Sequence, residues 1–530
     1  MPTQQRVESA PDLTTDVVID AAKAAGVCIR PLLRRVTDRA TGQVTTVPIP
    51  CGSTRETVCP SCADRARRLR MHQCREGWHL TDDPPSPTTD DQADDELHLG
   101  LDLDDAHASD DDEDASRRAR STRRRQDAPE LPRVPMDSRT TGRAFTDAKT
   151  GRTYRPSMFL TLTLGSYGKV IPGTGTPVDP ARYDYRRAAL DALLFPRLVD
   201  RFWQNLRRCA GYRVQYFAAV EPQKRLAPHL HAAIRGTIPR SVVRQVVKAT
   251  YHQVWWPPID RVVYDGDRLP VWDADASCYR DPHTAAPLTS WDRALDDLGA
   301  DPDAKPLHVL RFGAQVDLKG LLGGTEDSDR AVRYLCKYLT KSVTETYARD
   351  HVDPEDRAVR AYEAHIDRLH MELRWLPCSP RCANWLRHGV QPMEAGPGLI
   401  PGACPSKAHD REHLGLGGRR VLVSRQWSGK TLTEHRADRA TVVREVLQAA
   451  GIEPPDARRL AAEVLASDGR PRFEWADVPV LERDYTAAIS ASMRQRRAWR
   501  EQYEAAKAAG PRAGPPTAPV DRHSATESAA

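Results

Sequence analysis

Three stretches in the middle of the chain have the apolar content and alternation of buried β-strands. Residues 157–164 (SMFLTLTL) alternate threonines with bulky apolar side chains. Residues 216–220 and 229–234 are mainly apolar or aromatic and flank the turn-rich sequence PQKRLAP, which predicts a hairpin. Between the first strand and this hairpin, residues 180–208 have the length and spacing of a helix.

Together these elements predict an α+β fold. Its centre would be a mainly antiparallel sheet with flanking helices, and residues 331–342 (AVRYLCKYLTKS) would form a helix packed beside the sheet. Basic amphipathic helices are expected at residues 437–450 and 484–509. The predicted divisions are an N-terminal cysteine-rich module (1–80), a disordered linker (81–150), a central domain (151–345) with an insert (256–327), a second Cys/His and basic segment (346–435), a helical region (436–509) and a disordered tail (510–530).

The charged residues are segregated along the chain. Residues 81–114 hold fifteen Asp/Glu and no Lys/Arg, and six arginines follow between Arg117 and Arg125. This composition predicts a disordered linker, and it leaves the rest of the 530-residue chain more basic than its net charge of +5 suggests. A basic chain suits a polyanionic partner such as DNA. The linker is either a solvated spacer or an acidic arm that mimics DNA and inhibits binding.

Membrane and secretory segments are not evident in the sequence. No apolar run approaches the ~18 residues of a membrane span. The opening residues, MPTQQRVESAPD, lack the apolar segment of a signal peptide. These observations predict a cytoplasmic protein with no membrane partner, and in that compartment eleven cysteines favour metal sites over disulfides.

The predicted hairpin carries a glutamate and two histidines. Side chains alternate along a strand, so His229 and His231 point to the same face. Glu221 ends the partner strand, where the hairpin would bring its carboxylate near both imidazoles. Such a set is an incomplete coordination sphere for a divalent cation, with positions left for water and a phosphate oxygen. The alternative is a pair of histidines on the protein surface.

The segment YLCKYLTK repeats a tyrosine followed three residues later by a lysine. On one helix, Tyr334 and Tyr338 would share a face with side chains ~5–6 Å apart, which suits two nucleophiles. Lys337 and Lys341 would hold phosphates or favour the phenolate. Packing of one tyrosine on the core face is the alternative. If a single tyrosine acts, its place nearer the helix start favours Tyr334.

Taken in order, FLTLTL, the Glu–(seven residues)–His-Leu-His element and YLCKYLTK resemble the three motifs of the HUH-family replication initiators. The sequences CPSCADRARR and GLGGRRVLVSRQWSGKTL are similar to RepSA-like plasmid initiators of actinobacteria. The resemblance implies an HUH endonuclease-like fold and rolling-circle replication. This sequence departs from the simpler three-motif pattern of the family by its long insert and its acidic linker.

This resemblance implies a site-specific nickase and strand transferase that forms a 5′-phosphotyrosine and leaves a 3′-hydroxyl primer. Glu221, His229 and His231 would hold Mg²⁺ or Mn²⁺, and a host helicase and polymerase would be partners. Two alternatives remain. One is a relaxase or transposase with the same chemistry, although relaxases usually carry the tyrosine before the histidine motif. The other is a non-catalytic, zinc-containing DNA-binding regulator.

Two groups of cysteines have spacings typical of zinc sites. The first is Cys51, Cys59, Cys62 and Cys74, with His72 and His79 as substitutes. The second is Cys378, Cys382 and Cys404 with His409 or His413. The remaining cysteines are expected to be isolated, buried thiols: Cys28, Cys209, Cys278 and Cys336.

A basic segment follows the second cysteine group. In GGRRVLVSRQWSGK, a strand pair or turn would present its cations to the DNA backbone. The alternative is a solvated basic hairpin. The predicted contacts are Arg419, Arg420, Arg425 and Lys430.

Overall fold

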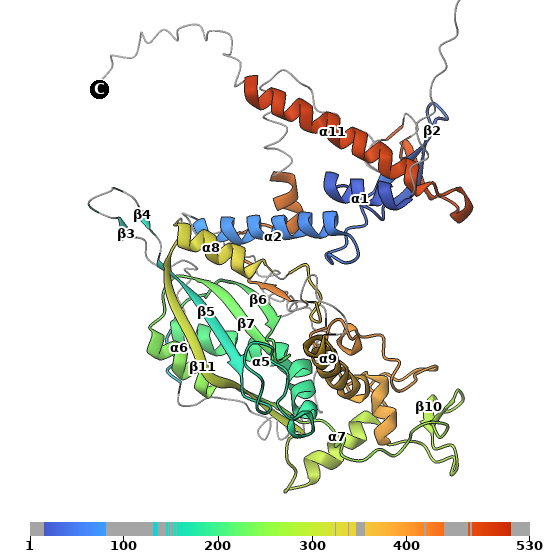
Figure 1. The fold of residues 1–530 in the computed structure, drawn as a ribbon. Helices are drawn as coiled ribbons and strands as arrows, with labels where there is room; N and C mark the ends of the chain where they lie inside the picture. Colours follow the sequence, from blue (N-terminus) through green and yellow to red (C-terminus); the bar gives the residue numbers. More distant parts are fainter. Residues whose placement is uncertain are drawn as a thin grey trace, which may run out of the picture. The chain divides into compact units, whose positions relative to one another are not determined.

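The computed structural model divides the described chain into two compact units, drawn in Figure 1. One unit takes its residues from 1–69 and 431–530, and the other from 70–430. The described residues are 15–80, 131–135, 145–146, 148, 151, 153–154, 156–323, 325–337, 339–345, 356–417, 420–438, 465–466 and 469–509. Most of the predicted linker, most of the helix expected at 437–450 and the tail lie outside them. Within the described part, no helix is both long and apolar enough to cross a bilayer.

A six-stranded antiparallel sheet forms the centre of the larger unit. Its order is β12 (Val421–Val423), β6 (Tyr216–Pro222), β7 (Pro228–Arg235), β5 (Pro156–Leu164), β11 (His308–Leu322) and β8 (Tyr251–Val254). The predicted α+β class and antiparallel sheet are confirmed, with the histidine strand β7 in the interior of the sheet.

The prediction of an insert at residues 256–327 was wrong for its last part. Strand β11 lies within that range and pairs with β5 from Leu322↔Pro156 to Phe312↔Leu164, with an irregularity between Phe312 and Val316. Its two faces are unequally buried, so it lacks the continuous apolar pattern of its neighbours. The remainder of the range does lie outside the sheet, as the hairpin of β9 (Val271–Asp273) and β10 (Cys278–Arg280) and the helix α7 (Trp291–Ala300).

Both faces of the sheet are covered, and the alternation along β7 shows how. Leu230 and Ile234 join the main core with α5 (Tyr185–Ala210) and α6 (Arg240–Ala249). Ala233, on the other face, joins a second core with Val332 of α8 (Glu326–Leu335). Figure 1 shows α8 apart from α5 and α6, beside the strands. Because successive side chains point to opposite faces, His229 and His231 belong to the α8 side.

Local capping fixes where these helices begin and end. Asp184 caps α5 by accepting a hydrogen bond from the Arg187 backbone N–H, and Gly211 ends the helix at φ 69°. Thr325 and Ser328 form a reciprocal capping box at the start of α8. The other elements of the larger unit are β3 (Phe145–Thr146), β4 (Thr153–Tyr154), α9 (Arg357–Trp375) and the 3-10 helices at Pro180–Arg182, Ala383–His388 and Lys407–His409.

The smaller unit joins the two ends of the described chain. Its antiparallel sheet has the order β13 (Phe473–Asp477), β1 (Leu32–Asp38) and β2 (Val44–Ile49). Helices α1 (Thr15–Ala25) and α11 (Tyr485–Ala509) pack through a small core that contains Ala22 and Ile489. The sequence predicted separate N-terminal and C-terminal modules, whereas strand pairing over more than 400 residues unites them.

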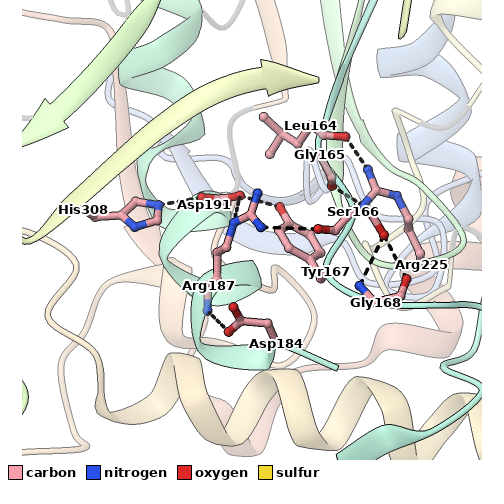
Figure 2. Close-up of polar contacts among 10 residues, drawn as sticks. All are labelled: Leu164, Gly165, Ser166, Tyr167, Gly168, Asp184, Arg187, Asp191, Arg225 and His308. Atoms are coloured by element: carbon pink, nitrogen blue, oxygen red, sulfur yellow. Dashed lines mark hydrogen bonds and ion pairs between the residues drawn. The ribbon is translucent and has the colours of Figure 1, made fainter. Parts of the chain in front are cut away.

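A buried carboxylate organises the polar contacts at one end of the large sheet (Figure 2). Asp191 of α5 accepts a hydrogen bond from the Tyr167 hydroxyl at 2.8 Å. Its other oxygen lies 2.6 Å from Nε2 of His308, the first residue of β11. Burial and the Asp191 charge raise the pKa of Tyr167 well above its usual value, so this hydroxyl remains a donor. The contact ties α5 to the start of β11.

An arginine in the β6–β7 turn extends this polar region to β5 (Figure 2). The Arg225 guanidinium donates to the carbonyl oxygens of Leu164 at 2.8 Å and Gly165 at 2.6 Å. It also lies over the ring of Tyr167, 5.3 Å from the ring centroid. The turn between Glu221 and His229 is therefore held against the end of β5.

Replacing Asp191 by alanine should destabilise the larger unit by about 2–3 kcal/mol, because the buried Tyr167 and the half-buried His308 lose their acceptor. Urea unfolding of the full chain, followed by tryptophan fluorescence, measures this change. The matched control is Asp297→Ala, which removes a carboxylate from the exposed pair with Arg293. That variant should lose no more than about 0.5 kcal/mol. Equal losses in the two variants would contradict the role given to Asp191.

Candidate functional site

Glu221, His229 and His231 converge on the α8 side of the sheet. Glu221 lies directly opposite His229 in the β6–β7 ladder, and His231 is two residues further on the same face. One ligand atom from each residue lies within 4.8 Å of the others. The Nε2 atom of His231 is 4.0 Å from a carboxylate oxygen of Glu221. All three side chains are buried.

Burial controls the protonation of this group. It lowers the pKa of His229 to about 4 and, together with the neighbouring His229, lowers that of His231 to about 3. Burial raises the pKa of Glu221 to about 7, against the opposing effect of Arg420 and Lys337. At neutral pH the imidazoles are therefore neutral, with a lone pair available for a cation.

The hydrogen bonds of the three residues leave acceptor atoms unused. The Thr161 hydroxyl lies 2.9 Å from Nδ1 of His231, which leaves the Nε2 side of that ring facing the site. Among the described residues, Oε1 of Glu221 and Nδ1 of His229 are buried and have no hydrogen-bond partner. Unpaired buried acceptors are costly unless something binds them. Two imidazoles and a carboxylate therefore fit a divalent cation.

Tyr334 brings a hydroxyl to the same site. It belongs to α8, and its oxygen lies 3.2 Å from Nε2 of His231. The ring of Phe159 packs edge-on against it, with centroids 6.1 Å apart. The side chain is 43% exposed, so solvent or a substrate can reach it. A partly exposed tyrosine hydroxyl and three possible metal ligands thus share one small region.

The second tyrosine motif does not continue this helix. Helix α8 ends at Leu335, so it is shorter than the helix predicted to continue to residue 342. Tyr338 itself lies outside the described residues. Lys337 is exposed, and its charge acts on Glu221. The backbone oxygen of Lys341 accepts a hydrogen bond from Arg420, while a role for its side chain stays a prediction.

The basic segment lies closer to the site than the sequence suggested. Arg420 is half-buried, bonds to the Lys341 carbonyl and acts electrostatically on Glu221. Lys430 is exposed and forms an ion pair with Glu76. Arg425 is half-buried, and Arg419 lies outside the described residues. Contacts of this segment with DNA therefore stay a prediction, and Arg420 has a structural partner instead.

The sequence did not indicate Thr161 as a residue of the site, and it predicted Arg420 as a DNA contact without placing it beside Glu221. Thr161 orients His231, and the alternation in FLTLTL, which places it on the face opposite Leu160 and Leu162, was a usable signal. Arg420 reaches the site because β12 adds to the sheet beside β6, pairing Val421 with Ala219. That pairing joins segments 202 residues apart, and no local pattern reveals it.

One cysteine cluster has the geometry of a zinc site in the smaller unit. It contains Cys28, Cys51, Cys59 and Cys62, whose sulfur atoms all lie within 4.8 Å of one another. The sulfurs of Cys28 and Cys59 are 3.8 Å apart. A tetrahedron of thiolates around zinc, with Zn–S bonds of about 2.3 Å, has edges of about 3.8 Å. The cluster could therefore hold zinc.

Cys28 takes the place that the sequence gave to Cys74. The hairpin of β1 and β2 pairs Leu32 with Ile49, so Cys28 before it and Cys51 after it meet at one end. Cys62 and Cys74 both belong to α2 (Pro60–His79), where twelve residues span about 18 Å. Cys74 instead lies in the second core of the larger unit, and burial raises its thiol pKa well above the usual value.

The second cluster is the set expected from the sequence. Cys378, Cys382, Cys404 and His409 present ligand atoms within 4.8 Å of one another. Cys378 and Cys404 sulfurs are 3.9 Å apart, and Nε2 of His409 is 3.5 Å from the Cys382 sulfur. Nδ1 of His409 lies 2.7 Å from the Leu373 carbonyl oxygen, which leaves Nε2 for a metal. This cluster could hold a second zinc ion.

Comparison with known proteins identifies a family. A family model described as "RepSA: Replication initiator protein, pSAM2" matches residues 14–477. A Streptomyces ambofaciens protein named "Replication initiator protein" is 27% identical over 230 residues, which cover 37% of this chain and 44% of that protein. The chain thus matches less than half the length of this relative. No solved structure matches the chain.

Zinc analysis of the purified full chain should find two ions per molecule. Cys28→Ser should lower the content to one, because the cluster loses a thiolate ligand. Cys74→Ser should leave it at two, since Cys74 lies in a core and not in a cluster. Inductively coupled plasma mass spectrometry gives both numbers. Loss of zinc in Cys74→Ser with retention in Cys28→Ser would reverse the assignment.

Proposed function

Because this chain belongs to the RepSA family of replication initiators, we propose that it starts plasmid replication by nicking one DNA strand at the origin. The nucleophile is Tyr334. The observation that carries the proposal is the 3.2 Å approach of its hydroxyl to His231, within the Glu221, His229 and His231 group. An HUH-type nickase, the rolling-circle mode and the use of Tyr338 as a second nucleophile belong to the same proposal.

The reaction is a transesterification. The Tyr334 oxygen forms a bond to the phosphorus of a phosphodiester, and the bond from phosphorus to the 3′ oxygen breaks. The phenol proton leaves to solvent, and the departing 3′ oxygen takes up a proton. The products are a 5′-phosphotyrosine and a free 3′-hydroxyl. The new ester keeps the energy of the broken bond, so the strand can later be rejoined.

Residues of this chain prepare the nucleophile and the phosphate. A free phenol has a pKa of about 10, so attack at neutral pH needs a nearby positive charge or acceptor. Lys337 is exposed three residues after Tyr334 and can bind the phosphate. Glu221, His229 and His231 would hold Mg²⁺ or Mn²⁺, which when bound would polarise the scissile phosphate. Edge-on packing against Phe159 restricts the tyrosine ring.

The products of nicking indicate which proteins would act next at the origin. A free 3′-hydroxyl is the primer that a DNA polymerase extends, and continued synthesis needs separation of the parental strands. We therefore expect a host polymerase and helicase to act on the nicked origin. A relaxase or transposase would share the chemistry, and a zinc-containing regulator would bind DNA without forming an adduct.

If Tyr334 is the single nucleophile, replacing it by phenylalanine should abolish the covalent adduct, because only the attacking oxygen is removed. The assay incubates the full chain and Mn²⁺ with single-stranded oligonucleotides tiling the replicon's origin region, and detects the adduct on a denaturing gel. The control is Tyr485→Phe, since Tyr485 has the same exposure of 43% but belongs to α11. Its adduct yield should equal that of the wild type.

Phenylalanine variants at Tyr338 distinguish a mechanism with one nucleophilic tyrosine from a mechanism with two. If both tyrosines act in turn, each single phenylalanine variant should still nick while strand rejoining fails, and Tyr334→Phe would then retain an adduct through Tyr338. If Tyr334 acts alone, Tyr338→Phe should nick normally. An adduct in the double variant would refute the assignment of both residues.

Replacing Glu221 by glutamine should weaken Mn²⁺ binding at this site, because a charged ligand becomes a neutral one of the same shape. Titration followed by electron paramagnetic resonance measures binding without any DNA. The matched control is Glu482→Gln, an exposed carboxylate paired with Arg35 in the smaller unit. Unchanged Mn²⁺ affinity in Glu221→Gln would remove this carboxylate from the ligand set.

A further inference from the structure

One face of α11 changes from apolar to basic along its length. Near its start, Ile489 and Met493 pack in the core shared with α1. Residues about one, two and three turns further on the same face are Arg496, Arg500 and Tyr503. This second half of the face therefore does not continue the core.

Two adjoining clefts lie along this basic half, within the smaller unit. Their volumes are about 880 Å³ and 680 Å³. Both are lined by Arg65 from α2 and by Arg496 and Arg500 from α11. The larger cleft also has three more cations in its wall, which are Lys23, Arg68 and Arg436. The feature is a continuous basic groove, and the two clefts are called the α11 groove below.

Three arginines of the α11 groove lie near one another, without a carboxylate partner in the described part of the chain. Within the described residues, Arg65, Arg496 and Arg500 are exposed and take part in no ion pair. Asp64, one of two acidic residues in the wall, is already paired with Arg67 and Arg68, and the other is Glu56. Like charges held together around a cavity favour an anionic occupant.

Aromatic side chains lie beside these arginines. Trp499 and Tyr503 line the smaller cleft, and Trp499 is 43% exposed. A planar guanidinium binds phosphate through two parallel hydrogen bonds, and an exposed aromatic ring stacks on bases. A basic groove with stacking rings is the arrangement by which proteins hold single-stranded nucleic acid without reading its sequence.

We propose that the α11 groove binds single-stranded DNA, with arginines on the phosphates and Trp499 stacked on a base. The groove is a second DNA site, separate in sequence from the nickase residues. The choice of DNA as the polyanion rests on the proposed initiator function. An initiator that opens an origin exposes single strands, and this groove retains one of them.

The test measures binding of the full chain to fluorescein-labelled oligo(dT) of thirty nucleotides, which has no origin sequence. The variant Arg65→Ala/Arg496→Ala/Arg500→Ala should lose roughly tenfold or more in affinity near 150 mM salt. The slope of log K against log salt should fall by about 2, since each phosphate contact on a single strand contributes about 0.7. Trp499→Ala should weaken binding without changing the slope, because stacking releases no counterions.

Two controls make the result specific. The variant Arg268→Ala/Arg293→Ala/Arg494→Ala removes the same charge from exposed positions outside the groove and should bind oligo(dT) as the wild type does. Replacing the three groove arginines by lysines should restore most of the affinity. Equal loss in both alanine variants, or loss only on a thirty-base-pair duplex, would overturn the proposal.

The adduct assay separates this proposal from the proposed function. The groove variant should still form the Tyr334 adduct on a short origin oligonucleotide at saturating concentration, since the groove contains none of the nickase residues. If the wild type forms no adduct but the groove variant loses oligo(dT) binding, the nickase proposal fails and the groove proposal stands. If adducts form normally and oligo(dT) affinity is unchanged in the variant, the groove proposal fails alone.

Discussion

The candidate site depends on the register between β6 and β7. Glu221 faces His229 across the ladder, and His231 lies one pleat further on the same face. A slip of one residue would turn the histidines into the main core and turn Leu230 and Ala232 towards α8. Such a slip is strongly disfavoured, because both faces of β7 are buried and each has its own apolar partners. The cores that stabilise the sheet therefore also position the side chains of the candidate site.

Much of this central arrangement could be predicted, because it depends on local patterns. The strand at 156–164, the hairpin with its Glu and His residues, and helix α5 follow from alternation, turn residues and helical spacing. The Cys378, Cys382, Cys404 and His409 cluster also followed from the types of residue and their spacing. In these segments each local preference agrees with the final fold.

Contacts distant in sequence could not be predicted in this way. Cys28 joins its cluster because the β1–β2 hairpin brings it next to Cys51. Cys74 has the more regular spacing, but it lies about three helical turns from Cys62 on α2. Strand β11 has a polar, unevenly buried face and resembles a loop until its pairing with β5 is known. Arg420 gains its place only through the edge strand β12. In each case tertiary pairing, rather than local propensity, decides the outcome.

The pairing of β1 with β13 has a consequence for biosynthesis. Asp38 leaves the ribosome long before its partner Phe473, which is more than 400 residues further along the chain. At about 5–20 residues per second, the delay is on the order of 20 to 90 seconds. During that time the larger unit can fold as its own segments emerge, whereas the β1–β2 hairpin has an open edge. The N-terminal segment is thus made first and completed last.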